Sequence, residues 1–124
     1  MNTETRTRVE DIMSSPVATI SETATVREAA TRMREQDISS LLVTATEAGI
    51  VTSTDVLDVV ADGRDPGKVL VGDVMTAPVE TVTPDLFMEE VAAMMTSFGI
   101  KHLPVVDDDY VGMVSSTDVA AQLS

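Results

Sequence analysis

The feature that most constrains this chain is an internal repeat with a period of sixty-two residues. Val9–Val17 reads Val-Glu-Asp-Ile-Met-Ser-Ser-Pro-Val, and Val71–Val79 reads Val-Gly-Asp-Val-Met-Thr-Ala-Pro-Val. A second signature occurs at Gly49–Asp55 and Gly112–Asp118, and consists of a glycine, two apolar residues, a hydroxyl, two small polar residues and an aspartate. The register slips by one residue near Glu47, as expected where a hairpin differs in length. Such a repeat predicts two copies of one supersecondary unit.

The sequence pattern of each copy predicts the element order β-α-β-β-α. A short alternating segment, Val17–Ile20 or Val79–Val82, favours a first strand. Apolar residues then recur at i, i+3, i+4 and i+7, which predicts an amphipathic helix in both copies. The helix positions are Val26, Ala29, Ala30 and Met33 in the first copy and Met88, Val91, Ala92 and Met95 in the second.

The two amphipathic helices differ in the sequence patterns that mark where they start. Thr25 and Glu28 have the spacing of a capping box, whereas the second amphipathic helix is expected to start near Pro84–Asp85. Two further strands and a last helix follow in each copy. The strands are expected at Leu41–Val43 and Leu103–Val106, and at segments ending in Ile50-Val51 and Met113-Val114.

We therefore expect an α+β fold in which two β-α-β-β-α repeats pack with pseudo-twofold symmetry. The predicted organisation is a flexible tail at 1–8, a first repeat at 9–62, a linker at 63–70 and a second repeat at 71–124. Because a unit of about 50 residues is marginal on its own, the copies are expected to bury their apolar faces against each other. Two equivalent ligand clefts would then form at their interface.

Composition restricts the partners and the location. The 124 residues include 21 acidic and 8 basic side chains, a formal net charge of -13, so nucleic acid and anionic membranes are not expected partners. Lys68 and Lys101 are the only lysines, a composition that favours a salt-adapted protein from a halophilic organism over an ordinary acidic one. The absence of cysteine excludes disulfides and thiolate sites. No apolar run has the length of a signal peptide core or membrane span, so we expect a cytoplasmic protein.

Both signatures occur twice, in order and in register, and with them residues 9–123 resemble a tandem pair of cystathionine-β-synthase (CBS) domains, the Bateman module. The resemblance implies regulatory binding of adenosine-containing ligands such as AMP, ADP, ATP or S-adenosylmethionine. It also implies a homodimer of CBS pairs and no catalytic activity. We expect no required cofactor, and we expect a separate effector protein or a rearrangement of the dimer to carry the output.

The second signature supports two interpretations. Thr52 with Asp55, and Ser115 with Asp118, have the spacing of a capping box, and this pattern alone favours a helix start without a ligand. The same geometry suits a nucleotide, because a helix N-terminus attracts phosphate and a carboxylate accepts hydrogen bonds from ribose hydroxyls. The resemblance implies that Asp55 and Asp118 hold ribose, and that Thr52 and Ser115 contact phosphate or ribose.

The resemblance further implies adenine contacts from the loop before the first strand and from the residue ahead of the second. These residues are Ser14, Ala18 and Ile38 in one copy, and Thr76, Glu80 and Ile100 in the other. The loop residues of one copy are expected to face the aspartate of the other copy, so that each site is composite. Ordinary core packing of the two isoleucines is compatible with this role.

The copies differ beside the second strand. Lys101 and His102 precede it in the second copy, where the first copy has Ser39 and Ser40. The family often places basic or polar phosphate contacts there. We therefore expect two unequal sites, with a phosphate-bearing ligand favouring the site that Lys101 and His102 reach.

The sequence also offers three alternatives to ligand binding. His102 with Ser115 or Ser116 and Asp118 supplies the residue types of a catalytic triad, but no nucleophile elbow accompanies them. Asp107–Asp109 lacks the alternating spacing and the glycine of a calcium loop, so a solvated turn without metal is expected. The strongest rival is a protein-interaction or dimerisation module whose ligand clefts are vestigial.

Overall fold

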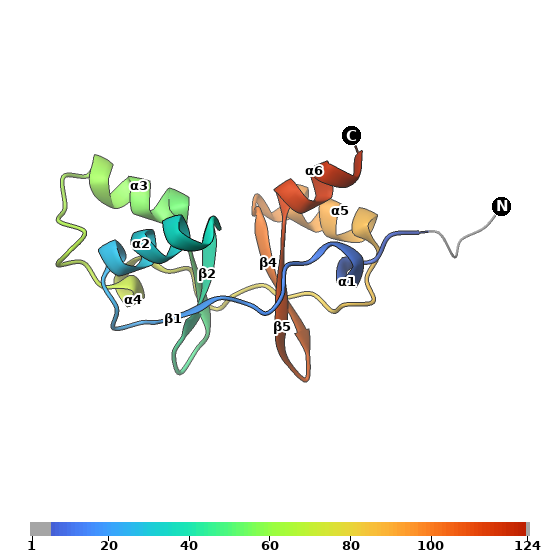
Figure 1. Cartoon of the computed structure of the whole chain (residues 1–124), viewed down its shortest axis with the longest axis horizontal. Coiled ribbons are helices and arrows are strands. Elements are labelled where there is room, and N and C mark those ends of the chain that lie inside the picture. Colours follow the sequence, from blue (N-terminus) through green and yellow to red (C-terminus); the bar gives the residue numbers. More distant parts are fainter. Residues whose placement is uncertain (1–5, 124) are drawn as a thin grey trace. The chain divides into compact units, whose positions relative to one another are not determined.

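A computed structural model describes residues 6–123, and the chain forms two compact units (Figure 1). The central unit is Ala18–Val79. The terminal unit joins Glu80–Ser124 to the N-terminal segment that ends at Val17. Residues 1–5 of the predicted flexible tail lie outside the described residues, whereas residues 6–8 contact the terminal unit.

The central unit is a three-stranded sheet with helices packed against it. The first and second strands are parallel and the second and third are antiparallel. Its core is aliphatic, with side chains from both the helices and the strands. The elements are β1 (Thr19–Ser21), α2 (Val26–Gln36), β2 (Ser40–Thr44), β3 (Gly49–Thr52), α3 (Ser53–Ala61) and α4 (Val71–Val74).

The terminal unit repeats this plan around an antiparallel hairpin. Its elements are α1 (Val9–Ile12), α5 (Met88–Phe98), β4 (His102–Asp107), β5 (Asp109–Ser115) and α6 (Ser116–Leu123). The α+β fold and the two repeats of helix and strands are thus confirmed. Within residues 6–123, no helix combines the length and apolarity that a membrane crossing requires.

The first strand expected at Val79–Val82 is reduced to one parallel bridge, between Val82 and Val105. In the central unit the amide of Leu42 donates to the carbonyl of Ala18 at 3.0 Å. The matching residue in the second copy is Pro104. Because proline has no amide hydrogen, the strand ladder cannot form at that point.

The amphipathic helices are confirmed, with one corrected start. Three of the four predicted positions are buried in each helix, namely Val26, Ala29 and Met33, and Met88, Val91 and Met95. The expected start of α5 near Pro84–Asp85 is wrong, because the helix begins at Met88. The carbonyls of Pro84 and Leu86 instead accept hydrogen bonds from the amides of Glu10 and Val9, at 3.1 and 2.9 Å.

The one-residue difference between the copies lies in the second hairpin. Val105 pairs with Gly112, but Val106 pairs with Tyr110, so Val111 is an extra residue in β5. A β-bulge of this kind absorbs an insertion without changing the pairing on either side. Asp108, with a φ of 67°, makes the turn.

The compact units do not coincide with the sequence repeats. Val9, at the start of the first copy, is buried in the core of the terminal unit with residues of the second copy. Val71, at the start of the second copy, is buried in the core of the central unit. We call Arg6–Ser14 the α1 strap and Lys68–Thr76 the α4 strap. Each strap therefore packs on the other copy.

Candidate ligand-binding site

Each strap crosses the strand that contains the first half of the second signature. Ser14 and Met113 exchange two backbone hydrogen bonds of 2.9 Å, and so do Thr76 and Ile50. The terminal unit thus joins the end of the α1 strap to β5, and the central unit joins the end of the α4 strap to β3. In each unit, the first signature of one copy is therefore hydrogen-bonded to the second signature of the other copy.

A glycine marks each crossing. A Cβ on Gly112 would lie 2.7 Å from the carbonyl oxygen of Ser14, and one on Gly49 would lie 2.8 Å from that of Thr76. The sulfur of the strap methionine, Met13 or Met75, would be 2.8 Å away in the same two positions. Since real Cβ atoms do not approach a carbonyl this closely, only glycine lets the strap lie on the strand. The sequence signal for this role is a glycine that occurs at the start of the second signature in both copies.

The second signature forms a capping box in both units. The amide of Asp55 donates to Thr52 Oγ1 at 3.4 Å, and the amide of Thr52 donates to Asp55 Oδ2 at 2.8 Å. The corresponding distances for Ser115 and Asp118 are 3.2 and 2.8 Å. The capping interpretation is confirmed. It is compatible with ribose binding, because a carboxylate has about four lone-pair sites.

The starts of α3 and α6 offer a ligand fewer free amides than an uncapped helix start would. The amide of Ser53 donates to the carbonyl of Ser39, and that of Ser116 donates to Lys101, both at 2.9 Å. The third amide of each helix is engaged by the cap. A phosphate at this position would therefore need side-chain donors as well as the helix end.

The central unit contains five predicted site residues, some in its sheet and some in the segments next to it. Hydrogen bonding runs across the sheet from Ala18 through Leu42 and Ile50 to Thr76. Ser40 lies opposite Thr52 in the register of β2 and β3. Ile38 packs against the core just before β2. The residues gathered here are Ala18, Ile38, Thr52, Asp55 and Thr76.

The terminal unit gathers the other seven. Ser14 is held on β5, His102 lies opposite Ser115, and Ile100 packs against the core. Lys101 and Glu80 are exposed. The carbonyl of Ala18 accepts a hydrogen bond from the Leu42 amide, but Glu80 cannot accept the matching one, because Pro104 in β4 has no amide hydrogen. The residues of this unit are Ser14, Glu80, Ile100, Lys101, His102, Ser115 and Asp118.

Each compact unit combines predicted site residues of both copies. Ser14, from the start of the first copy, lies in the unit of Asp118, and Thr76 lies in the unit of Asp55. Ser14 belongs to the terminal unit, whereas Ala18 and Ile38, with which it was grouped along the sequence, belong to the central unit.

The electrostatic surroundings of the two capping boxes differ. Burial lowers the pKa of His102, while the nearby Asp118 carboxylate acts to raise this pKa and Lys101 to lower it. The matching position in the central unit is Ser40, which is 6% exposed. The terminal unit thus places an ionisable imidazole beside its capping box where the central unit places a buried hydroxyl.

The residues named for the catalytic and metal alternatives have structural positions in the terminal unit. The hydroxyl of Ser115 accepts the cap hydrogen bond from the Asp118 amide at 3.2 Å. Among residues 6–123, no three His, Cys, Asp or Glu side chains are grouped as a metal site would require. Asp107–Asp109 forms the turn between β4 and β5.

Comparison with known proteins agrees with the two repeats. A model of the CBS domain matches residues 9–62 and 71–124. An uncharacterised protein of Methanopyrus kandleri is 36% identical over 117 residues, which are 90% of this chain, and the chain spans 60% of that relative's length.

Several solved structures share the fold at more than 30% sequence identity. One is a hexameric CBS-CP12 protein from bloom-forming cyanobacteria, with a TM-score of 0.89, 32% identity, and coverage of 94% of this chain and 72% of that one. Another is the CBS domain pair of protein MJ0100 in complex with 5'-methylthioadenosine and S-adenosyl-L-methionine. Its TM-score is 0.85 at 31% identity, covering 95% of this chain and 96% of that one. With both copies matched by the family model, the chain belongs to the CBS domain family and carries a CBS domain pair.

Proposed function

We propose that this CBS pair is a sensor that binds an adenosine-containing ligand at the strap crossing of each unit. The observation that carries the proposal is the crossing itself, which brings a strap residue, Ser14 or Thr76, onto the strand that ends in the capping box. A CBS pair of 31% identity forms a complex with methylthioadenosine and S-adenosylmethionine, which supports the ligand class. AMP, ADP and ATP share the adenosine group.

Each residue type has a chemical role in this proposal. Asp55 and Asp118 accept hydrogen bonds from the two ribose hydroxyls, and the Ser115 hydroxyl donates to ribose or phosphate. The Thr52 hydroxyl donates to Asp55 Oδ2 at 3.2 Å and turns to the ligand when ribose takes its place on that carboxylate. The adenine ring lies against apolar side chains and backbone amides. Its contacts are Ala18, Ile38 and Thr76 in the central unit, and Ser14, Glu80 and Ile100 in the terminal unit.

The two sites are proposed to differ in preference. Lys101 and His102 supply cationic or donor groups beside Ser115, which suits the phosphates of AMP or ATP. Ser40, beside Thr52, carries no charge. The central site therefore suits a ligand without phosphate at least as well as a nucleotide.

Thermal melting tests the ligand class. A ligand at one hundred times its Kd stabilises the folded state by about 2.7 kcal/mol, so AMP, ATP, S-adenosylmethionine and methylthioadenosine are compared in high salt. We expect a rise in Tm with at least one of them. The Asp55→Ala, Asp118→Ala double variant should lose that rise, and a full rise in this variant would refute the site assignment.

Calorimetry tests the difference between the sites. AMP should bind the terminal unit more tightly than adenosine does, and Lys101→Ala should reduce that difference. Equal affinity for AMP and adenosine in the parent and in Lys101→Ala would exclude the phosphate role.

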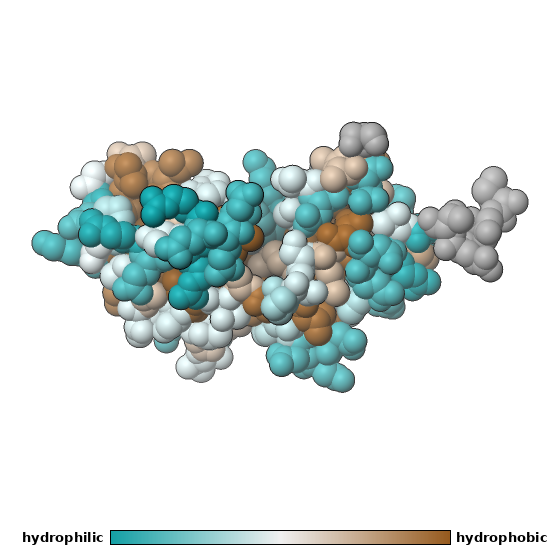
Figure 2. All heavy atoms as spheres, viewed as in Figure 1, coloured by the Kyte–Doolittle hydropathy of each residue, from teal (hydrophilic) through white to brown (hydrophobic). Residues whose placement is uncertain are grey.

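A second function has its own support. Leu57 and Val60, on the outer side of α3, are 66% and 57% exposed, and Figure 2 shows apolar side chains gathered over that helix. Exposed apolar patches mark interaction surfaces. We propose that this surface serves a homodimer of CBS pairs or a separate effector protein. Two results together would favour this function. No ligand would raise Tm at millimolar concentration, and the Leu57→Ser, Val60→Ser double variant would elute from size-exclusion chromatography as a smaller particle than the parent protein.

A further inference from the structure

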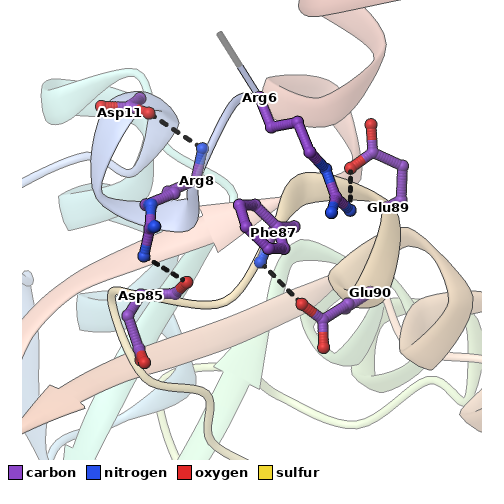
Figure 3. A network of polar contacts seen from close by, with 7 residues as sticks. All are labelled: Arg6, Arg8, Asp11, Asp85, Phe87, Glu89 and Glu90. Atoms are coloured by element: carbon purple, nitrogen blue, oxygen red, sulfur yellow. Dashed lines mark hydrogen bonds and ion pairs between the residues drawn. The ribbon is translucent and has the colours of Figure 1, made fainter. Parts of the chain in front are cut away.

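The α1 strap is held at its beginning by two arginines around one aromatic ring (Figure 3). The guanidinium carbons of Arg6 and Arg8 lie 3.6 and 5.0 Å from the centroid of the Phe87 ring. Arg6 also forms an ion pair with Glu89 at 3.5 Å. Cations over an aromatic face are attracted by its quadrupole. We call Arg6, Arg8 and Phe87 the arginine clamp.

Hydrogen bonds fix both sides of the clamp. The amide of Phe87 donates to Glu90 Oε1 at 3.1 Å, which places the ring at the start of α5. On the strap, Arg8 Nη1 donates to the carbonyl of Asp85 at 3.2 Å and the Arg8 amide donates to Asp11 Oδ2 at 2.8 Å. The clamp therefore ties the start of the strap to the start of α5 (Figure 3).

The central unit holds its strap in another way. Val26, Val59 and Val69 form a buried apolar cluster where the α4 strap meets α2 and α3. The matching residues of the terminal unit are Met88, Gln122 and Thr7.

The underlying backbone contact is the same in both units. The Met88 amide donates to Thr7 at 2.9 Å, as the Val26 amide donates to Val69. The terminal unit thus keeps the hydrogen bond but has no valine cluster around it. Its clamp residues stand where the central unit has Lys68, Leu70 and Thr25.

We propose that Phe87 is a positioning residue for the ligand site of the terminal unit. Held between Arg6 and Arg8, it anchors the α1 strap in place of the missing valine cluster, and so keeps Ser14 on β5 beside the capping box of Asp118. The anchoring follows from the contacts above, and the consequence for a ligand rests on the proposed function.

Hydrogen exchange at two matched amides tests the anchoring. The Ser14 amide donates to Met113 at 2.9 Å and the Thr76 amide donates to Ile50 at 2.9 Å, so each reports the opening of one strap. Phe87→Leu keeps apolar bulk but removes the ring, and should speed exchange at Ser14 by about tenfold, the loss expected for two exposed cation–π contacts. Exchange at Thr76 should not change.

The conservative variant separates the clamp from ordinary packing. Phe87→Tyr retains the ring, and should restore slow exchange at Ser14. If Phe87→Leu left exchange at Ser14 unchanged, or sped it equally at Thr76, the anchoring role would be overturned. Failure of Phe87→Tyr to restore protection would overturn the cation–π explanation.

The ligand consequence is tested with AMP in an Asp55→Ala background, which confines binding to the terminal unit. AMP should slow exchange at Ser14 in the Phe87→Leu protein, because a ligand held by the docked strap opposes its opening. AMP binding without protection at Ser14 would overturn the positioning role. If AMP did not bind the parent protein, the ligand role would fail together with the proposed function, while the exchange rates without AMP would still decide the anchoring.

Discussion

The two compact units keep the same backbone contacts but hold them with different side chains. Both have a strap crossing at a glycine and a hydroxyl-aspartate capping box. Around these contacts the central unit uses buried valines and Ser40, whereas the terminal unit uses the arginine clamp and His102. The backbone crossing and the cap thus define the unit, and under our proposal the surrounding residues set its ligand preference.

The largest expected effect is common to both units. Gly112→Ala and Gly49→Ala force a Cβ against a backbone carbonyl, and each should lower the free energy of unfolding by about 2–4 kcal/mol. Denaturant unfolding measures the loss. Gly67→Ala is the control, because its Cβ would meet the movable end of the Arg27 side chain at 3.1 Å. Equal effects at Gly67 and Gly112 would contradict the role of the crossings.

A smaller effect should separate the units. Val69→Thr introduces into the valine cluster the residue found at the matching position of the terminal unit, and should cost about 1–2 kcal/mol by burying a hydroxyl in place of a methyl group. Thr7→Val makes the reverse change where no cluster surrounds it. It should leave the free energy of unfolding nearly unchanged. A stabilisation by Thr7→Val as large as the loss in Val69→Thr would show that the units are held alike.

The capping boxes should again behave alike. Thr52→Ala and Ser115→Ala each remove a hydroxyl that accepts a helix amide, and should cost about 1 kcal/mol of stability. Thermal melts of the two single variants provide the comparison. A loss of stability in only one variant would show that the two caps contribute unequally to stability despite their similar geometry.

The smallest effect concerns pH and belongs to the terminal unit. Because burial lowers the pKa of His102, the unfolded chain takes up a proton there more readily than the folded one. Stability should therefore fall as pH decreases from the unfolded histidine pKa of about 6.5 through the lower folded pKa. His102→Ser should flatten this part of the pH profile, measured by denaturant unfolding between pH 5 and pH 8. An unchanged profile would contradict the assignment.

Ligand binding should reverse part of that pH dependence. A phosphate close to His102 would favour the charged imidazole and raise its pKa. We expect AMP to bind the terminal unit more tightly at lower pH, whereas adenosine should show no such trend. Calorimetry at two pH values in the Asp55→Ala protein makes the comparison, and parallel trends for the two ligands would argue against a phosphate contact.

The sequence alone determined the features that depend on neighbouring residues. The apolar spacing of Val26 and Met33 predicts a helix because helix periodicity is local. The hydroxyl and aspartate of the second signature predict a cap for the same reason. The repeat also predicts two units and a hairpin of variable length, which the structure shows as a bulge at Val111.

Tertiary structure decided which copy each strap joins and where several elements begin. Helix α5 starts later than the sequence predicts, because carbonyls upstream of Met88 accept hydrogen bonds from the α1 strap. The first strand of the second copy is reduced to one bridge, because Pro104 lies opposite it and has no amide hydrogen. The arginine clamp also joins residues far apart along the chain, Arg6 and Phe87. Periodicity and capping patterns report on neighbours within about one helical turn, whereas these contacts depend on which distant segments share a surface.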